Sequence, residues 1–271
     1  MMLRFLYRTI IGRLFLKVLT LPTVSVTVGS FLDTRISCFL IKPFVKKNGI
    51  DLSIFEDEKY ESFNAFFCRK VKKIYRPICQ DREAIISPCD GLLSVYHINN
   101  DLVIPVKQSR YHISDLLKNE SLASEFNDGL CLVFRLCVDH YHRYVYIESG
   151  SKGENTKIDG ILHTVQPIAL RDIPVFTENS REYTLIETSD AGKIVQMEVG
   201  AMLVGKIDNY EEKCECKRGE EKGRFMYGGS TIIVLLQKDC AVVPKDLIDA
   251  TSNNIETPVV MGQKLLEKQL S

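Results

Sequence analysis

Two consecutive glycines stand directly before two hydroxyl residues and a strongly apolar run near the end of the sequence. The order is Gly-Gly-Ser-Thr over residues 228 to 231, followed by aliphatic residues 232 to 236. β-branched residues favour a strand, whereas adjacent glycines favour a tight turn with backbone angles closed to other residues. The pattern therefore predicts a turn that displays the Ser230 hydroxyl in front of a strand. This hydroxyl could attack an outside carbonyl or the carbonyl of Gly229, and the motif is also compatible with an ordinary turn.

Length and charge limit the remaining possibilities. The chain has 271 residues, 45% hydrophobic and 26% charged, which is enough for a core in one domain with an appendage. Lys and Arg total 35, as do Asp and Glu. Without a global positive field we expect no nucleic-acid partner, and an anionic partner requires a local basic patch.

The nine cysteines are scattered singly, apart from Cys214 and Cys216. An odd number without framework spacing indicates a reducing compartment rather than a set of disulfides. These two cysteines could hold a metal ion, but no second Cys or His pair stands at ligand spacing. We therefore expect no metal site.

The most apolar part of the chain is residues 2 to 45, which basic residues interrupt repeatedly. The longest uncharged stretch, residues 18 to 32, contains Pro22 and is shorter than the about 20 apolar residues of a spanning helix. It also lacks the layout of a cleaved signal peptide. We expect short amphipathic helices on a membrane surface, separated near Gly12, with an arm packed on the protein's own core as the alternative.

Apolar residues from Tyr60 to Val71 recur at helical spacing, and a basic cluster follows over residues 69 to 73. This pattern predicts an amphipathic helix over residues 60 to 73. The basic cluster complements the dipole of such a helix, and it could also hold anionic lipid headgroups.

Beyond Pro77, short apolar or alternating runs separated by turn residues predict strands. The expected strands are residues 92–98, 102–106, 130–138, 144–147, 183–186, 194–207 and 231–236, with short helices over 113–117 and 245–250 and an exposed loop over 213–222. The predicted fold class is α+β: a mainly antiparallel β domain preceded by membrane-facing amphipathic helices. We place the arm at residues 1–59 and the domain at residues 60–271.

Three stretches place reactive groups among these strands: Asp90-Gly91, the segment that holds His140 and His142, and the turn before Ser230. An acid, an imidazole and a serine are the parts needed to activate a hydroxyl, because the histidine takes the proton and the carboxylate fixes its tautomer. On a strand the two histidines would share one face. Taken alone, Asp-Gly is commonly a plain turn and a single histidine is commonly structural.

Six motifs in order make the chain resemble the phosphatidylserine decarboxylases. They lie at residues 60–69, 76–78, 87–91 (Ser-Pro-Cys-Asp-Gly), 141–143 (Tyr-His-Arg), 199–205 (Val-Gly-Ala-Met-Leu-Val-Gly) and 228–231. The resemblance extends from about residue 60 to the C-terminus. With Gly-Gly-Ser-Thr, and with His163-Thr164-Val165 downstream of Tyr-His-Arg, the chain is similar to a bacterial branch of the family.

The resemblance implies a zymogen that cuts itself between Gly229 and Ser230 and converts Ser230 into a covalent pyruvoyl group. A larger chain, residues 1–229, and a smaller one, residues 230–271, would form a heterodimer that could oligomerise further. The amine of phosphatidylserine would form a Schiff base with the pyruvoyl carbonyl, lose carbon dioxide and leave as phosphatidylethanolamine, without an external cofactor or metal. Such an enzyme is expected on the cytoplasmic face of the cell membrane, as a peripheral protein on an anionic lipid surface.

By the same resemblance, Asp90 orients a histidine, and Ser230 is both nucleophile and pyruvoyl precursor. His142 matches the first histidine of the family pattern. Many members carry the histidine of self-cleavage three residues later, where this chain has Val145. His142 is therefore the favoured base, with His163 as the alternative and His140 as a weaker one.

Two other functions fit parts of the sequence. One is a non-catalytic, membrane-associated β domain in which the motifs are only turns. The other is a pyruvoyl-dependent decarboxylase of a soluble amino acid, which the apolar arm argues against because a water-soluble substrate requires no membrane contact.

Overall fold

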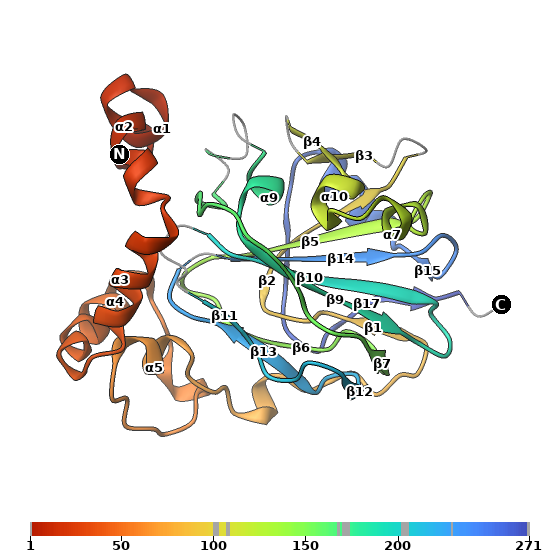
Figure 1. The fold of residues 1–271 in the computed structure, drawn as a ribbon. Helices are drawn as coiled ribbons and strands as arrows, with labels where there is room; N and C mark the ends of the chain where they lie inside the picture. Colours follow the sequence, from red (N-terminus) through yellow and green to blue (C-terminus); the bar gives the residue numbers. More distant parts are fainter. Residues whose placement is uncertain are drawn as a thin grey trace.

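A helical arm and a β domain make up the chain (Figure 1). The computed structural model describes residues 2–99, 103–106, 109–166, 169, 174–201, 206–228 and 230–269. The arm consists of α1 (Met2–Arg8), α2 (Ile10–Leu19), α3 (Pro22–Leu32), the 3-10 helix η1 (Arg35–Leu40) and α4 (Ile41–Asn48). In Figure 1 these helices stand along one side of the β domain, with α5 (Phe63–Phe67) close to α3 and α4.

A nine-stranded antiparallel sheet forms the centre of the β domain, in the order β12-β7-β9-β10-β14-β5-β2-β16, with β8 paired to β9. Its strands are β2 (Gly91–His97), β5 (Leu130–Leu136), β7 (Gly150–Lys152), β8 (Thr156–Ile158), β9 (Arg181–Glu187), β10 (Lys193–Val199), β12 (Cys214–Cys216), β14 (Ser230–Leu236) and β16 (Thr257–Val259). The α+β, mainly antiparallel fold predicted from the sequence is thus confirmed.

Smaller sheets and short helices complete the domain. One sheet has the order β1-β17-β15, another the order β11-β13-β6, and β3 pairs with β4. The strands are β1 (Ala84–Ile86), β3 (Val103–Val106), β4 (Ser109–His112), β6 (Arg143–Val145), β11 (Ile207–Asn209), β13 (Glu221–Phe225), β15 (Ala241–Val242) and β17 (Lys264–Lys268). The helices are η2 (Leu52–Ile54), η3 (Lys73–Tyr75), α6 (Ile113–Leu117), α7 (Glu120–Ser124), α9 (Val175–Glu178) and α10 (Lys245–Ser252).

Strand β14 lies in the interior of the large sheet, between β10 and β5. Every residue of β14 is buried, which explains why its sequence is a continuous apolar run instead of an alternating one. Each of its aliphatic side chains contributes about 1.5–3 kcal/mol by leaving water. The first residue of β14 is Ser230, paired with Leu136 of β5. Ser230 is therefore built into a strand that is buried along its whole length.

The sequence predicts a helix over residues 60 to 73, but only residues 63 to 67 are α-helical. The rest of that prediction is wrong. Ser62 caps the N-terminus of α5, and the helix ends at Phe67. The basic segment that follows is extended, because its backbone pairs with residues 54 to 56 through the bonds Glu56 N to Lys70 O, 2.8 Å, and Lys72 N to Ile54 O, 2.9 Å. Backbone pairing with a distant segment thus overrides the helical spacing of the side chains.

The expected strands match β2, β3, β5, β6, β9, β10 and β14 within a few residues, and α6 and α10 are the two short helices. β10 ends at Val199, earlier than predicted, and residues 202 to 205 of the Val-Gly-Ala-Met-Leu-Val-Gly motif lie outside the described residues. The predicted exposed loop over residues 213–222 instead contains β12 and the start of β13, and Lys222 is fully buried.

The arm is broken at Thr9, which caps α2 by accepting a hydrogen bond from the backbone of Gly12. Gly12 itself lies inside α2, where a Cβ atom would come within 2.0 Å of the Phe5 carbonyl oxygen. The sequence prediction of two short helical pieces is confirmed, but Gly12 serves the close approach of α1 and α2 and is not the break. No single helix among the described residues is long and apolar enough to span a membrane; α2 and residues 23–32, bent by 65°, pass that test only as a pair.

Candidate active site

The turn before β14 brings the candidate residues together. Gly228 has φ of +135°, a backbone conformation that residues other than glycine rarely adopt. Gly229, the other half of the predicted cleavage site, lies outside the described residues. The Ser230 side chain is fully buried, and its Oγ atom has no hydrogen-bond partner among the described residues. A buried hydroxyl without a partner costs free energy, so this group is held ready for a contact that the resting fold does not supply.

Helix α5 and the arm contact Tyr227, the residue directly before the two glycines of this turn. The Tyr227 backbone N–H donates to Asn64 Oδ1 at 3.3 Å, and Asn64 Nδ2 donates to Asp33 Oδ1 at 2.9 Å at the end of α3. The Tyr227 ring packs edge-on against Phe63 and Phe67, with ring centroids 5.1 and 5.2 Å apart. The turn is therefore anchored by the residues that connect the arm to the β domain.

His142 packs against the same turn. Its ring lies 4.1 Å from the Phe67 ring, and its backbone carbonyl accepts a hydrogen bond from Phe225 N at 2.9 Å. His142 Nδ1 lies 2.9 Å from the His140 carbonyl oxygen. A carbonyl can only accept, so Nδ1 carries the proton and Nε2 keeps its lone pair in the neutral ring. Nε2 is buried without a partner among the described residues. The ring is thus in the tautomer that a proton acceptor requires, with its lone pair on Nε2.

Burial lowers the pKa of His142 to about 3, because the charged ring would lose its hydration. The hydrogen bond to the His140 carbonyl and the nearby Gly228 carbonyl oppose this shift, whereas the Arg69 cation reinforces it. At neutral pH the His142 ring is therefore uncharged and able to accept a proton beside the turn.

Asp90 does not fix this tautomer. Its carboxylate forms a two-pronged bond to Arg76, with Nε to Oδ1 at 2.7 Å and Nη2 to Oδ2 at 2.5 Å. Oδ1 also accepts from the Met261 backbone N–H at 2.9 Å. The orienting bond to His142 comes instead from the His140 backbone carbonyl. Asp90 and His140 line one cavity of about 320 Å³, and a role for Asp90 in catalysis stays a prediction.

His163 lies away from the residues that pack on the turn. Its Nδ1 atom is 3.3 Å from the Tyr7 hydroxyl of α1, and its Nε2 atom is 3.5 Å from Glu178 Oε2. Its backbone is tied to Asn179 in both directions. These contacts place His163 at the junction between the arm and the β domain, so the geometry favours His142 as the base.

The remaining two positions are also settled by their contacts. His140 lies in the loop before β6 and not on a strand, because its Nδ1 accepts from Cys137 N at 3.2 Å; the prediction that His140 and His142 share a strand face is wrong. Val145 packs in an apolar cluster with Phe55 and Val71, whereas His142 packs on Phe67. Val145 thus fills an apolar site apart from the His142 ring.

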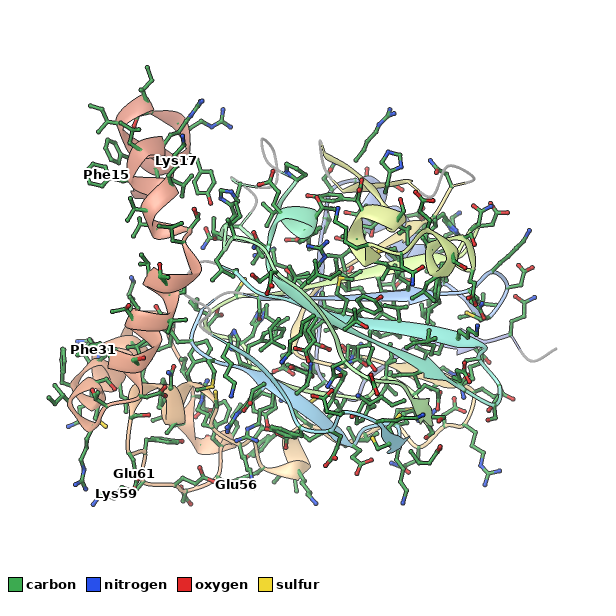
Figure 2. The ribbon with its side chains drawn as sticks, in the orientation of Figure 1. Phe15, Lys17, Phe31, Glu56, Lys59 and Glu61 are labelled. Carbon is green, nitrogen blue, oxygen red and sulfur yellow. The ribbon has the colours of Figure 1, made fainter. Side chains whose placement is uncertain are left out.

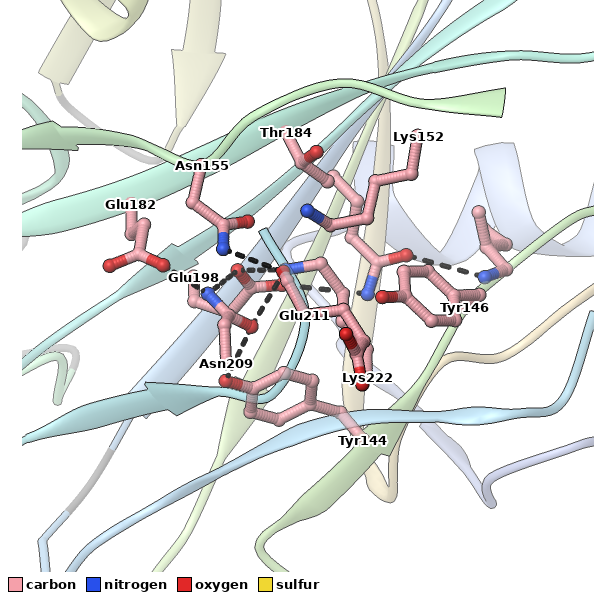
Figure 3. A network of polar contacts seen from close by, with 12 residues as sticks. Tyr144, Tyr146, Lys152, Asn155, Glu182, Thr184, Glu198, Asn209, Glu211 and Lys222 are labelled. Atoms are coloured by element: carbon pink, nitrogen blue, oxygen red, sulfur yellow. Dashed lines mark hydrogen bonds and ion pairs between the residues drawn. The ribbon is translucent and has the colours of Figure 1, made fainter. Parts of the chain in front are cut away.

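A buried ion pair fastens the strand that leads into the turn (Figure 3). Lys222 Nζ of β13 lies 2.6 Å from Glu198 Oε2 of β10, and both side chains are fully buried. Lys222 also donates to Asn209 Oδ1 at 2.8 Å, while Asn209 Nδ2 donates to Glu182 at 2.6 Å. Burial raises the pKa of Glu198, and Lys222 opposes that shift. The network joins β13 to the large sheet a few residues before the turn.

Replacing Lys222 by Met should therefore cost about 3–5 kcal/mol of folding stability, because the Glu198 carboxylate is left buried without its cation. The measurement is urea unfolding, in a Ser230→Ala background so that the chain stays in one piece. The exposed Lys213 provides the control, since Lys213→Met should change the unfolding free energy by less than about 0.5 kcal/mol. A loss below about 1 kcal/mol for Lys222→Met would show that the ion pair does not fasten β13.

Cysteine side chains occur as free thiols, and one of them lies in a cluster of metal-ligating atoms. All nine cysteines are free thiols, and Cys216 Sγ donates to the Gly150 carbonyl of β7 at 3.2 Å. Among the described residues, Cys137, Asp139 and His140 bring ligand atoms within 4.8 Å of one another. The Cys137 thiol, however, lies 3.1 Å from the Arg135 guanidinium, a cation that would repel a metal ion. We assign no metal to this group.

The fold and the site together define a class of protein: an α+β chain with an apolar arm and a reactive serine at the start of its own central strand. The family model for phosphatidylserine decarboxylase matches residues 63–267, and the chain belongs to this family.

Relatives with this name extend over nearly the whole chain. A phosphatidylserine decarboxylase proenzyme 2 from Clostridium acetobutylicum is 41% identical over 266 residues, covering 98% of this chain and 91% of the relative. Proenzymes from Clostridium botulinum strain Langeland and Clostridium perfringens strain ATCC 13124 are 39% and 36% identical, covering 89% and 97% of this chain and 83% and 91% of the relatives.

Three contributions to the site escaped the sequence analysis. The His140 carbonyl is a backbone group, so no side-chain pattern reveals it. Asn64 lies within the Tyr60–Arg69 motif, but helical spacing does not indicate that its side chain accepts a hydrogen bond from Tyr227 N. Lys222 stands in a charge-dense run, which is typical of solvent-exposed loops, and only its pairing with Glu198 explains its burial.

Proposed function

We propose that the protein is a self-processing phosphatidylserine decarboxylase that forms its pyruvoyl group from Ser230 and converts phosphatidylserine to phosphatidylethanolamine. The observation that carries this proposal is that two buried groups without hydrogen-bond partners lie on or against the turn before β14. They are the buried Ser230 hydroxyl and the unprotonated Nε2 atom of His142, both without partners among the described residues.

In the first stage His142 Nε2 accepts the proton of Ser230 Oγ, and the oxygen attacks the Gly229 carbonyl. The peptide C–N bond breaks as the nitrogen is protonated, and an ester joins the two halves. Loss of the Ser230 Cα proton then breaks the bond between Cβ and Oγ of Ser230. Both ester oxygens stay on Gly229, which becomes a carboxylate, and residue 230 becomes a dehydroalanine. Its enamine tautomerises, and water releases ammonia and leaves a ketone carbonyl. The left-handed glycine before the cut lets the backbone bend toward the attacking oxygen.

Once formed, the pyruvoyl group supplies a sink for the electron pair left behind by departing carbon dioxide. His142, which packs against the turn, is the group that we assign to return a proton to the product carbon. Its low pKa leaves the ring unprotonated at neutral pH but also makes it a weak base, so holding a proton for the donor role requires an anion beside the ring. The phosphate of the bound lipid brings such a charge, which separates the two roles of one histidine in time.

We also propose a peripheral position on the cytoplasmic face of the cell membrane, with anionic lipid as partner, and the arm supports the membrane contact. Five large apolar side chains of α2 are exposed: Ile10, Ile11, Leu14, Phe15 and Val18. In Figure 2 Phe15 and Phe31 lie on the side of the arm away from the β domain. An exposed apolar stripe bordered by cations is typical of a helix lying in the bilayer interface.

The intact mass of the purified protein tests this function first. We expect two chains, the smaller with 42 residues (271 minus 229) and lighter by the conversion of its first serine to a pyruvoyl group. The purified two-chain protein should release carbon dioxide from dispersed phosphatidylserine and not from free serine. A single chain of 30.9 kDa without activity would favour the non-catalytic membrane domain, and activity on free serine would favour the soluble-substrate enzyme.

A further inference from the structure

A second cavity lies between the arm and the β domain. It shares no lining residue with the turn before Ser230. It has a volume of about 520 Å³, and its polar and charged lining comes from Tyr7, Arg8, Arg13, Lys17, Thr20 and His163. The first five of these side chains belong to the arm, and His163 belongs to the β domain. The cavity therefore exists only where the two parts meet.

The charged side chains found in the lining of this cavity are cations. Among the described residues its lining includes three cationic side chains and no carboxylate, and one of the three, Arg8, makes a further interaction. For Arg13 and Lys17, both exposed, no ion pair is found in the described part of the chain. Glu178 approaches the cavity only through His163 Nε2, at 3.5 Å. Two exposed cations, Arg13 and Lys17, without a carboxylate partner in the described part of the chain favour an anionic occupant of the cavity.

The floor of the cavity is buried and ordered by hydrogen bonds. The Tyr7 hydroxyl accepts from Thr164 N at 3.2 Å and lies 3.3 Å from His163 Nδ1, to which it can donate. The backbone of Leu162 donates to the Thr20 carbonyl at 3.0 Å. Tyr7, Thr20 and His163 are each less than one tenth exposed. The arm is thus docked on the β domain at this cavity, and the cations of α2 are held over a fixed polar floor.

The two cations of α2 lie at the edge of its apolar stripe. Arg13 and Lys17 are one helical turn apart and therefore share one side of α2. Leu14 and Val18 follow them directly and are exposed on the outer side, 62% and 55% accessible. With the apolar stripe in the acyl boundary, the edge of an interfacial helix lies at the depth of the lipid phosphates. In Figure 2 Lys17 and Phe15 project from different sides of α2.

We propose that this cavity binds the phosphate-bearing headgroup of an anionic glycerophospholipid, separately from the substrate that reaches Ser230. A headgroup fits better than a free anion, because the acyl chains of the same lipid continue along the apolar stripe beside Arg13 and Lys17. Binding there ties the arm, the β domain and the bilayer together at one point. The inference rests on the proposed membrane contact of the arm and is independent of decarboxylation.

Flotation of the full-length protein with vesicles tests the site. The vesicles are phosphatidylcholine alone or phosphatidylcholine with one fifth phosphatidylglycerol. Each basic residue near such a surface contributes about 1 kcal/mol, or about a fivefold change in affinity, so Arg13→Gln/Lys17→Gln should weaken binding to the anionic vesicles by up to about thirty-fold. Lys46→Gln/Lys47→Gln, which removes two exposed cations from α4 of the same arm, should weaken it by less than about threefold. Equal losses in the two double variants would overturn the site in favour of diffuse attraction.

A soluble probe separates a headgroup from a free anion. Dihexanoyl-phosphatidylglycerol below its micelle concentration should bind the wild-type protein with saturation at one molecule per chain, and Arg13→Gln/Lys17→Gln should abolish this binding. Inorganic phosphate should bind much more weakly. Equal affinity for both ligands, or unsaturable lipid binding, would contradict the proposal. Self-cleavage and decarboxylation of detergent-dispersed substrate serve as folding controls, since these exposed residues lie outside the Ser230 site.

Discussion

Ser230→Ala leaves the protein as one chain of 30.9 kDa without decarboxylase activity, because no oxygen remains to attack the Gly229 carbonyl and no pyruvoyl group can form. The loss should be complete in both readouts, since no other described group occupies the position of Ser230 Oγ at the start of β14. Intact mass and release of labelled carbon dioxide measure the two readouts separately.

Thr231 provides a matched control. It is the next residue of β14, is equally buried, and its Oγ1 atom also lacks a partner among the described residues. Thr231→Ala removes a hydroxyl of the same kind from the neighbouring position and should still give two chains. If Ser230→Ala is cut, or if Thr231→Ala stays whole, the nucleophile has been assigned to the wrong residue.

His142→Ala should slow self-cleavage by about 100-fold or more, the usual effect of losing a positioned base, whereas His163→Ala should change the rate by less than about threefold. Precursor made in a short pulse of cell-free translation and followed on a denaturing gel gives this rate without any substrate. The expected difference arises because His142 Nε2 has no partner among the described residues, whereas both ring nitrogens of His163 face other side chains. Normal cleavage in both variants would exclude both histidines.

The pH dependence of the same reaction provides an internal check. A base accepts a proton only when unprotonated, and the folded pKa of His142 is about 3, so its active fraction stays near one from pH 8 down to pH 5. The rate of wild-type cleavage should be nearly flat over this range. An exposed imidazole with a pKa near 6.5 would lose activity about thirty-fold by pH 5, so such a drop would contradict a buried base.

How far the sequence predicts this molecule depends on the kind of contact involved. β14 was recognisable because seven buried residues on both faces of a sheet leave an unbroken apolar run. The basic segment after α5 was not, because its conformation is set by backbone bonds to residues 54 to 56, which leave no trace in side-chain periodicity. The site shows the same division. The motifs named Ser230 and His142, but the tautomer of His142 depends on a carbonyl two residues away.

The position of β14 also fixes when the protein can mature. Its two neighbours in the sheet come from residues 130–136 and 193–199, and the Asp90 carboxylate is held by the backbone of Met261, which follows Ser230 in the sequence. β16 and β17, which follow Ser230 in the sequence, pair with β2 and β1 near the beginning of the domain. The domain around the serine is therefore complete only when the segments that follow it have also folded. Formation of the second chain end would then act as a record of finished folding, and a truncated or misfolded copy would carry no reactive carbonyl into the cell.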